Sequence, residues 1–214
     1  MNGIIGKKIG MTRVFDAQGH QVPVTVIEAG PCRVVQAKTE KTDGYNAVQI
    51  GFMEQKPRRV SKAVAAHCAK AQLPPFRVLR EIRVDASENL EPGATVTVSM
   101  FDGVPFVDVV ATTKGRGFQG VVRRHGFTGG RKTHGSGNHR RTGSIGMKTW
   151  PSRVFKNKRM PGHMGVNRVT TQNLKVIQVR PEDNVLLVRG AVPGATGSLV
   201  MVYKGLKKKA VPSS

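Results

Sequence analysis

Acidic residues are absent from a long central stretch of this chain. No Asp or Glu occurs between Asp108 and Glu182, although the 214 residues include 13 acidic residues and 35 Lys or Arg. The formal net charge is +22. A surface this positive repels itself unless a polyanion neutralises it. The composition therefore favours a nucleic-acid partner over an anionic membrane or a heparin-like polymer.

Long hydrophobic runs and paired cysteines are also lacking. No segment approaches the roughly 20 apolar residues of a membrane-spanning helix. The first residues lack the apolar segment and cleavage pattern of a secretory signal. Cys32 and Cys68 are the only cysteines, and two isolated cysteines fit a reducing cytosol with both thiols buried. We expect a cytoplasmic protein that makes no membrane contact.

The acid-free stretch lacks the residues that catalysis and metal binding require. A general acid–base pair or a Ser-His-Asp set needs a carboxylate. The histidines of this stretch match no zinc-binding spacing; they are His125, His134, His139 and His163. Glycines at 115, 117 and 120 are in G-x-G-x-x-G register, but no helix is evident after them and the next acid is Glu182, which excludes a dinucleotide site. We expect no catalytic residue, no cofactor, no metal and no small-molecule substrate.

Short segments rich in Val and Ile make up most of the remaining chain. Turn sequences such as DAQGH, EPG and RPEDN separate them, which is typical of β-strands. The predicted strands span 22–29, 32–38, 46–52, 76–84, 94–100, 105–111, 174–179, 184–190 and 198–203. Many short strands with few helices between them favour a mainly β fold with a closed antiparallel barrel.

One segment differs from this strand pattern. Residues 58–70 place Val60, Val64, His67 and Cys68 at helical spacing, and two prolines follow at 74 and 75. This pattern predicts a single helix. We place it in a small inserted lobe at about 56–92.

The charge distribution divides the chain into a β-barrel body, at 1–112 and 169–214, and a basic insert at 113–168. The insert contains 14 Lys or Arg and 12 of the 25 glycines. Its apolar residues occur singly, so it cannot bury enough surface to offset the entropy of ordering its backbone. Because predicted strands flank it, the insert is a loop tethered at both ends. We expect a polyanion to order it.

Basic pairs recur along the insert, separated by small residues and single aromatic residues. Guanidinium and ammonium groups bind phosphate, and isolated aromatic rings stack on unpaired bases. A thin chain with charge on every face suits a channel in folded RNA better than a DNA groove, since no recognition helix or two-stranded ribbon is evident. The predicted RNA-binding residues are Lys114, Arg116, Arg123, Arg124, His125, Arg131, Lys132, His134, His139, Arg140, Arg141, Lys148, Trp150, Arg153, Lys156, Lys158, Arg159, His163 and Arg168.

Longer sequence blocks occur in order from one end of the chain to the other. They include GKKIGMT (6–12), KGRGFQGVVRRHGF (114–127), HRRTGSIG (139–146), VFKNKRMPGHMG (154–165) and LLVRGAVPGATG (186–197). Together these blocks resemble the bacterial form of the large-subunit ribosomal protein L-three family. The resemblance implies a closed six-stranded Greek-key barrel of the translation-protein type, with a small α-containing inserted lobe and a long extended basic loop.

The same resemblance implies a structural role without enzymatic activity. Members of the family bind near the 3′ end of the large (23S-type) ribosomal RNA, nucleate subunit assembly and neighbour the large-subunit proteins L-fourteen and L-nineteen. Their basic arm extends toward the peptidyl transferase centre. Its tip corresponds here to Gly143, Ser144, Ile145, Gly146, Met147, Lys148, Thr149 and Trp150. A DNA-compacting architectural protein is the alternative that shares the same charge.

Three positions depart from the pattern of this family. Many bacterial relatives carry, just after the GSIG turn, a glutamine that is methylated on its side-chain nitrogen, whereas this chain has Met147. Methionine has no amide, so we predict that this methylation is absent. His125-Gly126 replaces a common Trp-Asn pair, and Pro161 replaces a common alanine, which changes stacking and stiffness in the insert.

Overall fold

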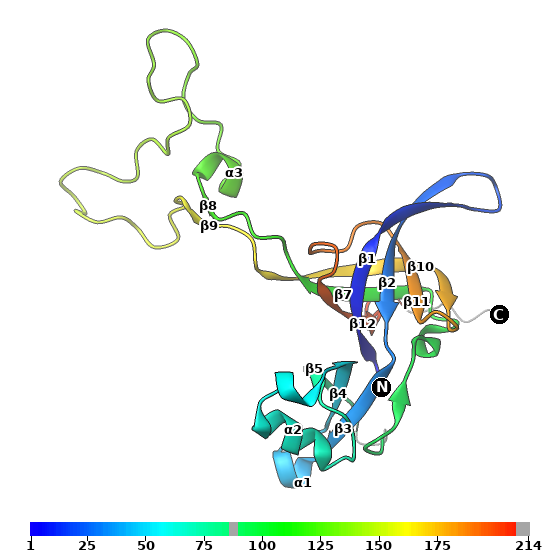
Figure 1. The fold of residues 1–214 in the computed structure, drawn as a ribbon. Helices are drawn as coiled ribbons and strands as arrows, with labels where there is room; N and C mark the ends of the chain where they lie inside the picture. The colour runs from blue at the N-terminus through cyan, green and yellow to red at the C-terminus, as the bar shows by residue number, and fades with distance from the viewer. Residues whose placement is uncertain (86–89, 209–214) are drawn as a thin grey trace. The chain divides into compact units, whose positions relative to one another are not determined.

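The computed structural model describes residues 1–85 and 90–208, and strands dominate this range (Figure 1). Six of the strands close into a barrel in the order β1-β12-β7-β10-β11-β2, and every neighbouring pair is antiparallel. Their bounds are β1 (Gly3–Phe15), β2 (Gln21–Ala29), β7 (Phe106–Thr112), β10 (Arg168–Arg180), β11 (Val185–Arg189) and β12 (Leu199–Lys204). The prediction of a mainly β fold with a closed six-stranded barrel is confirmed.

The barrel strands follow a Greek-key order. Strands β7, β10 and β11 are successive antiparallel neighbours, and β12 returns to pair with β7. Three consecutive strands with a fourth beside the first define this motif. Closure leaves no strand edge unpaired, because β1 joins β12 to β2.

Strand β1 is the one barrel strand that the sequence did not predict, because glycines and lysines interrupt its apolar pattern. The structure gives a reason for two of these glycines. A Cβ on Gly3 would lie 2.5 Å from Cδ1 of Tyr203, and a Cβ on Gly6 would lie 2.6 Å from the carbonyl oxygen of Glu28. Glycine in a strand allows such a close approach by a neighbouring group. Barrel packing therefore requires glycine at these two positions.

A second sheet lies in the chain between β2 and β7, with strand order β5-β4-β3-β6. Its strands are β3 (Cys32–Lys38), β4 (Ala47–Glu54), β5 (Phe76–Arg83) and β6 (Thr95–Val96). The strands predicted at 32–38, 46–52 and 76–84 are therefore present, but they lie outside the barrel. The strand predicted at 94–100 is mostly wrong: β6 has two residues, and the 3-10 helix η2 (Val98–Phe101) follows because it buries both Val98 and Phe101.

The helix predicted at 58–70 is present as α2 (Lys62–Ala69), and the 3-10 helix η1 (Pro57–Arg59) precedes it. Ser61 caps α2 by accepting a hydrogen bond from the backbone N–H of Val64 at 3.4 Å. The helix buries Cys68 against Val35 and Phe76 of the second sheet. The predicted lobe at about 56–92 also includes residues 86–89, which lie outside the described residues. No helix in the described ranges is long and apolar enough to cross a membrane.

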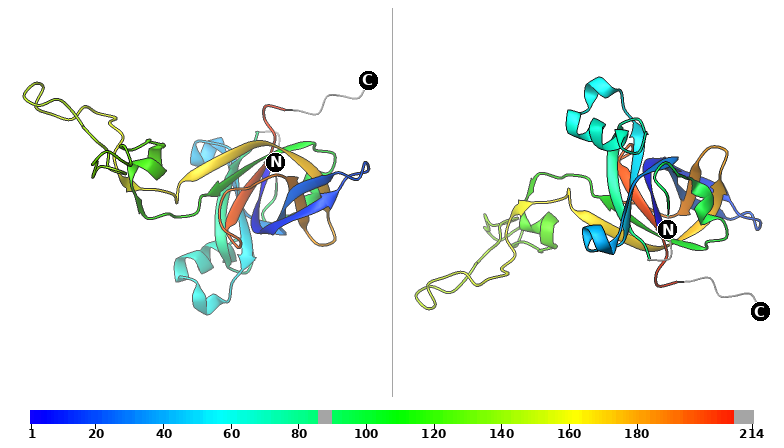
Figure 2. Two further views of the ribbon diagram at one scale, coloured as in Figure 1. Left: turned by 90° about the horizontal axis from the view of Figure 1, so that it is seen from above. Right: turned by 90° about the horizontal axis from the view of Figure 1, so that it is seen from below.

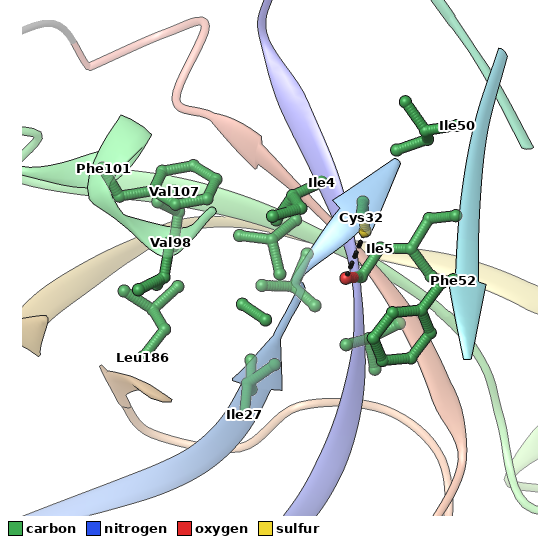
Figure 3. Packing of buried hydrophobic residues seen from close by; sticks show 14 of the residues in the cluster. Ile4, Ile5, Ile27, Cys32, Ile50, Phe52, Val98, Phe101, Val107 and Leu186 are labelled. Carbon is green, nitrogen blue, oxygen red and sulfur yellow. Dashed lines mark hydrogen bonds between the residues drawn. The ribbon is translucent and has the colours of Figure 1, made fainter. Parts of the chain in front are cut away.

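The main hydrophobic core joins the interior of the barrel to the second sheet (Figure 3). Ile4, Ile27 and Leu186 from three barrel strands are fully buried in it. Cys32 is also fully buried, and its Sγ lies 3.5 Å from the carbonyl oxygen of Ile5. Burial raises the pKa of the Cys32 thiol to about 12. Both cysteines are free and buried, as the sequence indicated.

The chain divides into two compact units. The barrel unit comprises Met1–Thr112 and Arg168–Ser214, and the basic unit comprises Thr113–Asn167. The barrel unit contains both sheets, and further views show the second sheet and α2 forming a lobe of this unit (Figure 2). Arg168, which we placed in the basic insert, pairs with Thr112 at the start of β10 and so belongs to the barrel unit.

Candidate nucleic-acid interface

The basic unit is described throughout and contains three short elements. They are β8 (Phe118–Gln119), α3 (Val121–His125) and β9 (Gly162–His163). Residues 126–161 contain no helix or strand. The expectation that no helix follows the glycine register at 115–120 is wrong, because α3 begins at Val121. This helix has only five residues and the unit has no carboxylate, so a dinucleotide site remains without support.

The two ends of the basic unit run side by side as an antiparallel ribbon, which the sequence did not predict. The backbone N–H of Thr113 donates to the carbonyl of Asn167, and the N–H of Arg116 donates to the carbonyl of Met164, both at 2.9 Å. Further along, Phe118 pairs with His163 across β8 and β9. The ribbon therefore brings an aromatic and an imidazole side chain to opposite positions.

Helix α3 is fixed to the returning chain by two polar side chains. Nη1 of Arg124 donates to the carbonyl oxygen of Met160 at 2.7 Å, and Nε2 of His125 lies 3.1 Å from the same oxygen. Arg124 and His125 are half-buried. Their hydrogen bonds are internal to the unit, so they are the predicted RNA-binding residues least available to an external ligand.

The basic unit has almost no hydrophobic core. Val121 is its one buried hydrophobic side chain, and all residues of the unit are described. Loops beyond α3 are held by isolated polar contacts, such as the N–H of Gly130 to the carbonyl of His139 at 3.2 Å and Ser144 Oγ to the carbonyl of Gly146 at 2.9 Å. Such contacts are weak where water competes for each partner. Burial therefore contributes little to the order of this unit.

The remaining predicted RNA-binding side chains of the unit are exposed. They are Lys114, Arg116, Arg123, Arg131, Lys132, His134, His139, Arg140, Arg141, Lys148, Trp150, Arg153, Lys156, Lys158, Arg159 and His163. The Trp150 side chain is 84% exposed and that of Phe118 is 77% exposed. Arg153 lies over the ring of Phe155, with Cζ 5.9 Å from the ring centroid.

No cation of the basic unit can be neutralised within the unit, because residues 113–167 contain no carboxylate. Unpaired guanidinium and ammonium groups beside exposed aromatic rings are the groups that bind phosphates and unstacked bases. Across the described ranges, no three His, Cys, Asp or Glu side chains are grouped closely enough to hold a metal ion. The basic unit thus has the chemistry of a nucleic-acid interface.

A folded β-barrel joined to a basic, core-poor unit is the organisation of a nucleic-acid-binding protein. The family model of ribosomal protein L3 matches residues 65–185, a span that includes the whole basic unit. The chain belongs to the ribosomal protein L3 family, and the resemblance seen in its sequence blocks is confirmed.

Named relatives match the chain almost from end to end. The "Large ribosomal subunit protein uL3" of Desulfitobacterium hafniense (strain Y51) is 52% identical over 207 residues, covering 97% of both chains. The protein of the same name from Corynebacterium jeikeium (strain K411) is 53% identical over 208 residues, covering 97% of this chain and 95% of its own. That of Geobacter metallireducens is 48% identical over 207 residues, covering 97% of this chain and 99% of its own.

Proposed function

We propose that this chain is a structural constituent of the bacterial large ribosomal subunit and binds the RNA of that subunit through its basic unit. The observation that carries the proposal is the set of exposed cations in a unit with no carboxylate and one buried hydrophobic residue. The names of the relatives, large ribosomal subunit proteins, support this choice of assembly. The role is architectural and needs no catalytic side chain, and the protein works in the ribosome in the cytoplasm.

The two units become ordered in different ways. The barrel unit has its own hydrophobic core and folds around it. The basic unit gains its order from RNA, because phosphates neutralise cations that otherwise repel one another and bases cover its exposed aromatic rings. Binding and ordering of the basic unit are therefore one event.

Family resemblance extends the proposal to the position of the protein in the subunit. It binds near the 3′ end of the large (23S-type) ribosomal RNA and nucleates assembly there. Residues 143–150 form the tip that extends toward the peptidyl transferase centre, and L-fourteen and L-nineteen are the neighbouring proteins. The exposed, acid-free tip is compatible with such a phosphate-rich environment.

Salt dependence of binding to purified bacterial large-subunit ribosomal RNA tests the proposal. If about ten basic residues contact phosphates, the logarithm of affinity should fall with the logarithm of salt concentration at a slope near −7 to −9. Duplex DNA of equal phosphate content serves as the competitor. A slope near zero, or preferential binding to the duplex, would contradict the proposal, and the second result would indicate a DNA-compacting protein.

Hydrogen exchange tests the coupling between binding and order. Amides of residues 126–161 should exchange rapidly in the RNA-free protein and become protected in the complex, while amides of the barrel strands should be protected in both. Strong protection of residues 126–161 without RNA would show that the unit folds by itself.

A further inference from the structure

Strand β12 presents two different faces. Its side chains alternate, so the buried Val200 and Val202 lie in the barrel core, whereas Leu199, Met201 and Tyr203 are on the outer face. Met201 and Tyr203 are only partly buried there, and together with Leu199 they line a groove.

The groove lies within the barrel unit and has a volume of about 600 Å³. Its lining includes Val110 of β7, the outer side chains of β12, and Val78 and Arg80 of β5. Arg168, at the start of β10, also contributes to the lining. This volume falls in the usual range of small-ligand sites, about 300–1,000 Å³.

Two arginines give the groove a positive charge. Arg80 and Arg168 are exposed, and neither forms an ion pair with a described residue. The acid in the lining, Glu81, is already engaged: its carboxylate accepts from Lys38 Nζ and from the Tyr45 hydroxyl, each at 2.8 Å. The groove therefore keeps two unneutralised guanidinium groups.

Tyr203 is half-buried in the same groove. Burial raises the pKa of its phenol, and the charges of Arg168 and Arg80 oppose that shift to a smaller extent. Both guanidinium groups are thus close enough to influence the phenol. At neutral pH the phenol remains protonated, so its hydroxyl can donate a hydrogen bond to a ligand in the groove.

Resting on the proposed function, we infer that this groove binds one unpaired nucleotide of the large-subunit RNA. The apolar walls and the Tyr203 ring accept the base, and Arg80 and Arg168 hold its phosphate. Guanidinium groups bind phosphate bidentately, and folded RNA exposes unstacked bases in loops and bulges. This combination of apolar side chains, a phenol ring and two cations favours a nucleotide over a lone carboxylate of a protein partner, which supplies no ring to stack.

Two charge-matched double variants of the full chain test the inference. Arg80→Gln with Arg168→Gln removes the cations of the groove, and Arg77→Gln with Arg189→Gln removes two exposed strand arginines outside it. Affinity for purified large-subunit RNA is measured at one salt concentration. The groove variant should bind roughly tenfold more weakly than the control variant, because it loses bidentate phosphate contacts as well as net charge.

Photocrosslinking to 4-thiouridine-substituted RNA gives a direct reading of the site. Trypsin cleavage after Arg189 and Lys204 yields a peptide, residues 190–204, that includes Tyr203. The wild-type chain should form a nucleotide adduct on this peptide. The groove variant should lose that adduct and keep those in residues 113–167.

The inference requires both results. Equal affinities of the two double variants, or no adduct on residues 190–204, would overturn it while leaving RNA binding by the basic unit intact. In assembled subunits, a bifunctional protein crosslinker that joins this peptide to another protein, with no RNA adduct on the peptide, would also overturn it. Failure of the wild-type chain to bind the RNA at all would instead refute the proposed function.

Discussion

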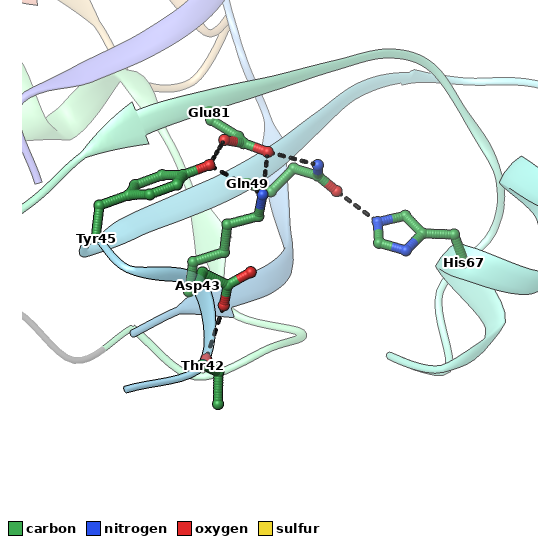
Figure 4. A network of polar contacts seen from close by, with 7 residues as sticks. Thr42, Asp43, Tyr45, Gln49, His67 and Glu81 are labelled. Carbon is green, nitrogen blue, oxygen red and sulfur yellow. Dashed lines mark hydrogen bonds and ion pairs between the residues drawn. The ribbon is translucent and has the colours of Figure 1, made fainter. Parts of the chain in front are cut away.

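Lys38 Nζ lies 2.8 Å from Oε1 of Glu81 in the second sheet, although their strands, β3 and β5, are separated by β4. Glu81 is at the centre of a polar network with Tyr45, Gln49 and His67 (Figure 4). The Tyr45 hydroxyl donates to the other carboxylate oxygen of Glu81 at 2.8 Å. Lys38 Nζ lies 5.3 Å from the centroid of the Tyr45 ring. Gln49 joins the same carboxylate to His67 of α2. The network therefore connects three strands of the second sheet and helix α2.

The Lys38–Glu81 pair predicts a pH-dependent contribution to stability. The Glu81 carboxylate accepts hydrogen bonds from Lys38 and Tyr45, and these lower the pKa of Glu81 below the ordinary value of 4.5. The hydrogen bond to Glu81 in turn raises the pKa of Lys38. The Glu81 contribution is thus complete above pH 4.5 and is lost as pH falls through the lowered pKa. Glu81→Gln should reduce Tm by a few degrees at pH 7 and by progressively less below pH 4.5.

The matched control for Glu81→Gln is Glu54→Gln, which removes an exposed carboxylate of the same sheet that has no ion pair in the described residues. Thermal unfolding followed by circular dichroism at several pH values measures both variants. Glu54→Gln should leave Tm almost unchanged. An equal decrease for the two variants at pH 7, or a Glu81→Gln effect that persists in acid, would contradict this role.

Lys8 stabilises the connection between β11 and β12. It is 92% buried, and its Nζ donates to the carbonyl oxygens of Val192 at 2.7 Å and Gly194 at 3.4 Å. Lys8→Met should lower the free energy of unfolding by about 1–3 kcal/mol, because buried carbonyls lose a charged donor. Lys7→Met removes the same charge from the neighbouring position and should cost less. Urea titration compares the two variants, and similar free energies would contradict the prediction.

Deletion of Thr128–Lys148, with a short Gly-Ser linker, should leave the barrel folded. The segment contains no helix or strand and no buried side chain. Unfolding of the barrel should therefore remain cooperative, while the salt slope of RNA binding becomes less negative by about 4 if all five deleted bases contact phosphate. A full-length variant with these five bases changed to Gln separates the loss of charge from the loss of chain. Non-cooperative unfolding of the deletion variant would place the segment in the core.

Met147 should remain unmethylated in the cell. Its side chain is 68% exposed but has no amide nitrogen to accept a methyl group. Intact-mass measurement of the protein purified from ribosomes should show no added methyl at this position, whereas a Met147→Gln variant restores an acceptor amide. An added methyl group located at Met147 would contradict the prediction.

Local sequence pattern predicted most strands but not their partners. The segments at 32–38 and 46–52 read as strands because Val and Ile recur in them, yet the same pattern suits a barrel or a separate sheet. Strand β1 was not predicted, because the need for glycine at positions 3 and 6 arises from close contacts with Tyr203 and Glu28, which are distant in the sequence. Pairing depends on contacts between residues far apart in sequence, which no short window contains.

In the candidate interface, too, local sequence predicted some features, and contacts between distant residues decided others. Charge and composition located the basic insert and its exposed cations directly. The internal roles of Arg124 and His125 depend on the carbonyl of Met160, more than 30 residues away in the chain. Likewise, the groove brings Arg80 near Arg168 through the packing of β5 beside the barrel.

The sequence by itself determined that residues 113–168 carry positive charge without any acid and have too few apolar side chains for a hydrophobic core, because charge and apolar content are local properties. Tertiary structure alone decided which six strands close the barrel. It also decided that Arg80 and Arg168 of the barrel unit share a groove with Tyr203. Barrel closure and groove formation join distant segments, so their free energy resides in packing and strand pairing that composition does not specify.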